Sequence, residues 1–239
     1  MRSLTKIAHR GASGLFPENT RLAFQKAIEA RADMIELDCQ LSHDGHVVVF
    51  HDEKLSRIAK TRGTIGRRSL EQLKKVDIGS WRKKSFCRER IQTLEEVLAL
   101  IDGDASLCID IKQFSGSPAG IELKLLFTIS HFDYLDRVIL SSFDYHCLRR
   151  VREFAPDARI GVIFGAGVRE DPFAAAIGLG ARSIHVQKEL ASRDFLQRAW
   201  DEGFNVYVWT LNDRVEIEKF ASLGVQGIVS DFPERFAKI

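Results

Sequence analysis

Short apolar runs rich in Val and Ile alternate with amphipathic segments along the whole chain of 239 residues. This alternation is typical of βαβ units, in which parallel strands are joined by helices that cover the sheet. Residues 20–31 have the apolar spacing of such a helix, and capping boxes at Ser69 and Thr93 predict two further helix starts. The sequence therefore predicts an α/β fold. Its nine strand candidates are residues 6–10, 34–39, 46–50, 106–112, 137–142, 159–164, 183–187, 205–210 and 227–231.

Residues 46–50 differ from the other strand candidates, because no crossover helix fits between them and residues 34–39. The link contains Asp44-Gly45, a strong hairpin signal, so we expect 46–50 to return antiparallel to 34–39. Eight strands then remain for a TIM (β/α)8 barrel, with an open doubly wound sheet as the alternative. The length suits one domain over residues 1–239, with an insertion at about 52–104 between the return strand and the next barrel strand.

The predicted hairpin brings polar side chains together. If Asp44 and Gly45 are the two central turn residues, Asp38 lies opposite His51, with Cα atoms roughly 4.5–5.5 Å apart. Because strand side chains alternate, Glu36 and Asp38 share the face that His51 approaches. The same alternation puts Asp110 beside Lys112 on the following barrel strand. Apolar neighbours on these two strands are expected to face the helices: Ile35, Leu37, Ile109 and Ile111.

Three carboxylates converge in this prediction, those of Glu36, Asp38 and Asp110. Such a cluster is costly inside a barrel unless a cation neutralises it. Oxygen ligands without cysteine favour a hard divalent ion, Mg²⁺ or Ca²⁺, over zinc. The alternative is a structural network in which Arg10 and Lys112 alone balance the carboxylates.

Two histidines flank the predicted cluster. His9 and Arg10 end the first strand, and His51 ends the return strand. A lone histidine at a strand end is usually structural, and we expect His185, which lies inside a strand candidate, to be a satisfied interior histidine. Two of them near Arg10 and Lys112 instead favour phosphoryl transfer, with two imidazoles as acid and base.

The motifs form a recognisable series. IAHRGASGLFPENT is followed by AFQKAIEARADMIELDCQLSHDGHVVVFHDEKLSR, and then by LKKVDIG, TLEEVL, IDIK, SSFD, VWTLND and GIVSDFP. This series resembles the glycerophosphodiester phosphodiesterase family over nearly the whole chain and in the same order. The resemblance implies metal-dependent hydrolysis of glycerophosphodiesters to sn-glycerol 3-phosphate and an alcohol.

The resemblance also implies a role for each site residue. His9 and His51 would be the catalytic pair, and Glu36 and Asp38 would bind the metal. The implied substrate-binding residues are Arg10 and Lys112 for the phosphate and Trp209 for the glycerol.

Some positions depart from the family pattern. Asp110 stands where most relatives have a Glu ligand, which shortens its reach by roughly 1.5 Å, so the metal would shift or a water would bridge. Gln92 replaces a usual Pro, and Ile58-Ala59 replace a Thr pair, within the insertion that caps the site in this family. These changes concern the preference for the alcohol.

Charge and composition exclude other partners. A formal net charge of +2 is too small to indicate nucleic-acid binding. The four cysteines are scattered, and no apolar run approaches the roughly 20 residues of a membrane span. We expect a cytoplasmic protein without stable membrane insertion. The sequence leaves the oligomeric state, the alcohol head group and the choice of metal open.

Two other functions remain as alternatives. A lysophospholipase D-type activity on lysolipids, by way of a cyclic phosphate, would keep the fold and change the reaction. Only the basic and aromatic stretch WRKKSF (residues 81–86) suggests an interfacial patch of the kind it would need. A non-catalytic binding protein is the other alternative, and the intact histidines and carboxylates argue against it.

Overall fold

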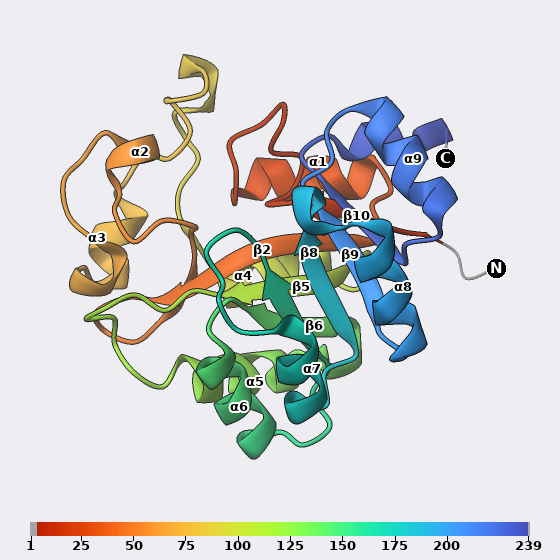
Figure 1. Ribbon diagram of the computed structural model, residues 1–239. Coiled ribbons are helices and arrows are strands. Elements are labelled where there is room, and N and C mark those ends of the chain that lie inside the picture. The colour runs from red at the N-terminus through yellow and green to blue at the C-terminus, as the bar shows by residue number, and fades with distance from the viewer. Residues whose placement is uncertain (1–3, 239) are drawn as a thin grey trace.

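In the computed structural model, which describes residues 4–238, eight parallel strands close into a ring because β1 pairs with both β2 and β10. The predicted TIM barrel is confirmed, and the open-sheet alternative is wrong (Figure 1). The barrel strands are β1 (Thr5–His9), β2 (Met34–Leu41), β5 (Ser106–Ile111), β6 (Val138–Ser142), β7 (Ile160–Phe164), β8 (Ser183–Gln187), β9 (Asn205–Trp209) and β10 (Gly227–Ser230).

Helices connect successive barrel strands and cover the ring. They bury their apolar faces against the outward side chains of the strands, among which Ile35, Leu37, Ile109 and Ile111 lie as predicted. The covering helices are α1 (Arg21–Glu29), α4 (Leu94–Ile101), α5 (Ile121–His131), α6 (Tyr145–Phe154), α7 (Pro172–Leu179), α8 (Arg193–Asp201) and α9 (Arg214–Leu223). Short 3₁₀ turns add η3 (Leu135–Arg137), η4 (Lys188–Leu190) and η5 (Pro233–Lys238).

The return strand β3 (Val47–Val49) runs antiparallel to β2 and lies outside the ring, as predicted. The predicted register, however, is wrong by one residue. Cys39 pairs with Val49, and Leu41 pairs with Val47. The backbone N–H of Phe50 donates to the carbonyl of Asp38 at 2.9 Å, so Phe50 lies where His51 was expected.

The turn explains this difference. The N–H of Ser42 donates to the carbonyl of His46 at 2.9 Å, which leaves three residues in the loop. Gly45 is the third of them and has a φ of +80°. A three-residue hairpin loop places a left-handed residue at this position, a conformation that glycine adopts without steric cost. The Asp-Gly pair thus does mark the hairpin, but in a loop one residue longer than the two-residue turn.

The segment between β3 and α4 has its own apolar core. It contains η1 (Ile65–Arg67), η2 (Lys84–Phe86), α2 (Ser56–Ala59), α3 (Leu70–Lys74) and β4 (Gln92–Thr93), a short strand that the sequence did not predict. Both predicted capping boxes are present, at α3 and at α4. Helices α2 and α3 lie beside the ring, apart from the barrel helices (Figure 1). The core residues are Val48, Phe50, Leu55, Ile58, Ile65, Leu73, Val76, Ile78 and Ile91.

The interior of the ring changes from apolar to polar along the strands. An apolar cluster fills the part of the interior that lies away from the polar end: Ile7, Met34, Cys108, Ile139, Tyr207 and Val229. Acidic and basic side chains follow toward the carboxyl ends of β1, β2 and β5. Active sites of TIM barrels lie at this end.

Candidate active site

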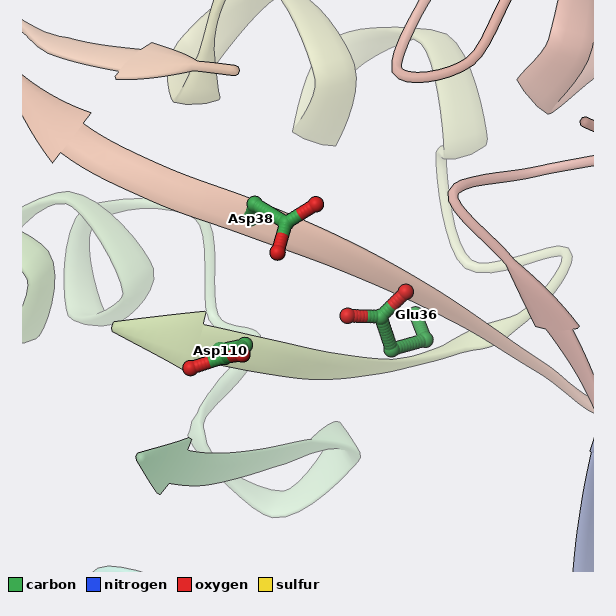
Figure 2. Close-up of side chains that lie close together, drawn as sticks. All are labelled: Glu36, Asp38 and Asp110. Carbon is green, nitrogen blue, oxygen red and sulfur yellow. The ribbon is translucent and has the colours of Figure 1, made fainter. Parts of the chain in front are cut away.

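Three carboxylates meet where β2 and β5 run side by side. Asp38 pairs directly with Asp110 in the sheet, and Glu36 lies on the same face of β2 two residues earlier. One oxygen from each carboxylate lies within 4.8 Å of the others. Figure 2 shows the three side chains around a common space. This buried acidic cluster can bind a metal ion.

Two cations lie against the cluster. The Nζ of Lys112 is 3.1 Å from an oxygen of Asp38 and 2.6 Å from one of Asp110. The Nε of Arg10 lies 3.3 Å from Asp38, and the backbone N–H of Arg10 donates to Glu36 at 3.0 Å. Within the described residues the other oxygen of Asp110, Oδ1, is buried without a hydrogen-bond partner. A buried carboxylate oxygen without a donor is what a metal ligand requires before the ion binds.

The pKa values reflect an excess of negative charge. Burial, and then the charge of Asp38, raise the pKa of Glu36 to about 7. Burial also raises the pKa of Asp110 to about 6, although Lys112 opposes this. Burial acts against the charged form of Asp38 as well, but Lys112 and Arg10 outweigh it and lower the pKa of that carboxyl. The cluster therefore carries more negative charge than its own cations stabilise.

His9 ends β1 next to Glu36, its neighbour in the sheet. Its Nδ1 lies 2.5 Å from Oδ1 of Asp231, and its Nε2 lies 3.9 Å from Glu36. Asp231 also accepts hydrogen bonds from Ser13 at 3.1 Å and from Asn212 at 2.6 Å. Burial lowers the pKa of His9, but the hydrogen bond to Asp231 and the charge of Glu36 outweigh burial, so the pKa is raised.

His51 reaches the cluster from outside the ring. Its Nδ1 lies 2.6 Å from Oδ1 of Asp52, and Asp52 accepts a hydrogen bond from Nε of Arg57 at 2.5 Å. The Nη2 of Arg57 also donates a hydrogen bond to Glu18 at 2.6 Å. Glu18 accepts a second one from Arg10 at 2.8 Å. Burial lowers the pKa of His51; the charge of Asp38 opposes this, and the Arg10 charge adds to it.

All eight predicted site residues line one pocket of about 240 Å³. Trp209 forms part of its wall, where the indole Nε1 donates to the carbonyl of His185 at 2.9 Å. The ring of Phe143 meets the Trp209 ring edge-on, with centroids 5.9 Å apart. His185 is buried, as predicted, with its Nε2 2.9 Å from the hydroxyl oxygen of Ser183.

Sequence reasoning missed the partners of these residues. Asp231 follows the last barrel strand. His9 became a candidate because it is a polar residue at the end of a barrel strand, and the same reasoning applies to Asp231. Asp52 directly follows His51. Asn19 donates to Asp38 at 2.8 Å from a left-handed backbone position with a φ of +56°, and no sequence signal predicts that contact. Among the described residues, no helix is long and apolar enough to cross a membrane.

The fold and the site together define a TIM-barrel enzyme whose polar mouth can hold a metal ion beside two imidazoles. Comparisons with known proteins are consistent with this class. The sequence profile of the glycerophosphoryl diester phosphodiesterase family matches residues 9–235. A glycerophosphodiester phosphodiesterase from Caldanaerobacter subterraneus subsp. tengcongensis is 39% identical over 230 residues, covering 95% of this chain and 94% of that protein.

Solved structures agree with the sequence matches. A phosphodiesterase from Oleispira antarctica, in complex with the product sn-glycerol-3-phosphate, has a TM-score of 0.89 at 28% identity and covers 96% of this chain and 93% of that one. A glycerophosphodiester phosphodiesterase from Thermotoga maritima has a TM-score of 0.79 at 28% identity, covering 100% and 99%. The chain belongs to the glycerophosphoryl diester phosphodiesterase family. It is a phosphodiesterase that hydrolyses glycerophosphodiesters.

Proposed function

We propose that the protein converts glycerophosphodiesters to sn-glycerol 3-phosphate and an alcohol, with His9 and His51 as acid and base. The observation that supports this most directly is that one pocket is lined by both histidines and by the three carboxylates. Hydrolysis requires a base for the attacking oxygen and an acid for the departing alkoxide, and two imidazoles can share these tasks. The relative from Oleispira antarctica, solved with sn-glycerol-3-phosphate, supports the choice of product.

Glu36, Asp38 and Asp110 are proposed to hold one divalent cation, Mg²⁺ or Ca²⁺. The oxygen-only donors and the unpartnered Asp110 oxygen fit a hard ion. Such an ion, when bound, neutralises phosphate charge and stabilises the charge that develops during the reaction. Arg10 and Lys112 are proposed to bind the remaining phosphate oxygens, and Trp209 the glycerol.

The insertion is proposed to receive the departing alcohol, as part of one phosphodiesterase domain over residues 1–239. A second, open pocket of about 620 Å³ adjoins the first and lies between the insertion and the loops after β5 and β6. His51 and Lys112 border both pockets, while Glu53, Lys54 and Phe114 line only the second. The first pocket, at about 240 Å³, is below the usual range of about 300–1,000 Å³ for ligand clefts. The first pocket is proposed to hold the phosphate and the glycerol, and the wider second pocket the alcohol.

A panel assay tests this function. Purified protein, stripped of metal with EDTA, is incubated with glycerophosphodiesters carrying ethanolamine, choline, glycerol or inositol, and with a lysophospholipid. We expect release of sn-glycerol 3-phosphate from the water-soluble diesters only after Mg²⁺ or Ca²⁺ is added. Full activity in a thoroughly chelated preparation would rule out the metal site. Faster turnover of the lysophospholipid would favour the alternative activity.

A cytoplasmic location is also part of the proposal. All four cysteines are free, and Cys39, Cys108 and Cys147 are buried. Free thiols are typical of reducing compartments. Fractionation of the source cells should recover the activity with cytoplasmic markers, and recovery in an extracellular or envelope fraction would contradict this.

A further inference from the structure

Gln40 lies on β2 two residues beyond Asp38 and is a buried residue, 2% exposed. Its amide Nε2 donates two hydrogen bonds, to the carbonyl of Phe50 at 2.7 Å and to the carbonyl of Asp52 at 2.9 Å. These two carbonyls belong to the residues on either side of His51. A primary amide offers two N–H donors, and here both are used on the backbone that carries the histidine.

Among the described residues, the backbone at His51 makes few other hydrogen bonds. Strand β3 ends at Val49, and the last backbone hydrogen bond of the hairpin joins the N–H of Phe50 to Asp38. Because the register differs by one residue from a two-residue hairpin, His51 does not stand opposite Asp38. The direction of the imidazole therefore depends on its contact with Asp52 and on how the chain bends after Phe50, and the amide of Gln40 holds both sides of that bend.

We propose that Gln40 is a positioning residue for the reaction, because its amide fixes the backbone on both sides of His51 and thereby directs the imidazole toward the phosphodiester. The inference rests on the proposed function, since it takes His51 as one member of the acid-base pair. A misplacement of about 1 Å at a reacting group can cost about 100-fold in rate. Methionine has a similar volume and no donor, so it would fill the space without holding the carbonyls.

Gln40→Met is the variant that tests this role, with glycerophosphoethanolamine as the substrate in the metal-loaded enzyme. We expect kcat to fall about 10- to 100-fold with little change in KM, because binding of the phosphate and glycerol does not involve Gln40. Ser42→Ala is the matched control. It removes two partly buried hydrogen bonds of the same hairpin without touching His51: one that the Ser42 hydroxyl donates to Asp44 and one that it accepts from the N–H of His46. It should lower stability but leave kcat unchanged.

A double-mutant cycle separates positioning from a merely structural role. If Gln40 acts through His51, Gln40→Met should cost no more than about twofold in a His51→Ala background. The same fold loss in both backgrounds would overturn the inference, and so would a folded Gln40→Met enzyme with normal kcat. If Gln40→Met fails to fold, Gln40→Asn replaces it, because it keeps the amide but is too short to reach both carbonyls.

The cycle also distinguishes this inference from the proposed function. An inactive His51→Ala with an active Gln40→Met would refute only the role of Gln40. A fully active His51→Ala would refute the role of His51, and the inference about Gln40 with it.

Discussion

The two histidines of the site differ in the carboxylate that each one contacts. His9 contacts Asp231 and His51 contacts Asp52, in both cases through Nδ1. An ionised carboxylate can only accept a hydrogen bond, so each contact places the proton on Nδ1 and leaves Nε2 free for the proton transfer proposed above. The two partners lie far apart in the sequence, because Asp231 follows the last barrel strand and Asp52 directly follows His51. The pair is thus built by two independent contacts, and each can be changed separately.

Substrates with different leaving groups test which histidine is the acid. A poor leaving group needs a proton as it departs, whereas p-nitrophenolate departs without one. We expect at least one of His9→Ala and His51→Ala to lose about 100-fold or more on glycerophosphodiesters and to keep measurable activity on a p-nitrophenyl phosphodiester. Initial rates on both substrate types measure this. Small and equal losses for both variants would mean that neither histidine is the acid.

His185 should make the stability of the protein depend on pH. Burial lowers its pKa to about 3, so the folded state keeps it neutral where the unfolded state binds a proton. The contribution of His185 to the free energy of unfolding is fully present above the unfolded pKa of about 6.5. It is lost as the pH falls toward 3, at about 1.4 kcal/mol per pH unit. Denaturant unfolding of the wild type and of His185→Gln at pH 7 and pH 5 measures the difference. We expect the variant to lose less stability between the two, and parallel losses would contradict this.

Strand β2 serves the site at three alternate positions. Glu36 and Asp38 belong to the carboxylate cluster, and Gln40 supports the backbone at His51. The three side chains share one face because strand residues alternate. The strand extends past the ring to pair with β3, and this extra length brings the insertion to the mouth of the barrel.

The core of the insertion should be separable from the barrel. Ile65 is fully buried within that core. Ile65→Ala leaves a cavity, and such changes cost about 2–5 kcal/mol where the site cannot collapse. We expect faster hydrogen exchange in residues 52–91, a lower kcat/KM, and little change in the exchange of β7 and β8. Leu179→Ala, in the barrel helix α7, is the control that should loosen the barrel instead. Uniform loss of protection in Ile65→Ala would show that the two parts unfold together.

Closure of the ring brings together site residues that are far apart in the sequence. His9 near the N-terminus meets Asp231 near the C-terminus because β1 and β10 are neighbours. The carboxylates come from β2 and β5, which are separated by the whole insertion in the sequence. The cluster has an excess of negative charge, so a divalent ion bound there should stabilise the whole folded protein.

Metal binding should raise the melting temperature of the folded protein. A ligand that binds only the folded state adds about 2.7 kcal/mol at 100 times its Kd. We expect Mg²⁺ or Ca²⁺ to stabilise the metal-free wild type and to leave Glu36→Gln nearly unchanged, since that variant lacks one ligand. Glu71→Gln removes the same charge from the exposed face of α3 and serves as the control. Differential scanning fluorimetry with and without each ion measures this, and an equal shift in Glu36→Gln would exclude the cluster as the site.

The barrel and its inward-facing carboxylates could be predicted from local patterns in the sequence. The alternation of strands and helices reflects which side chains must be buried, and this pattern is local in the chain. The same alternation put Glu36, Asp38 and Asp110 on inward faces, where the structure has them. The Asp-Gly pair likewise indicated the hairpin, because turn preferences depend on neighbouring residues.

The contacts that hold the two histidines could not be predicted from the sequence. A loop of three residues instead of two shifts the hairpin by one position, and Gly45 with its φ of +80° is compatible with that longer loop. The contacts of His9 with Asp231 and of Arg57 with Glu18 join residues that are 222 and 39 positions apart. Such pairs leave no periodic pattern in the sequence, because they depend on closure of the ring and on the packing of the insertion against it.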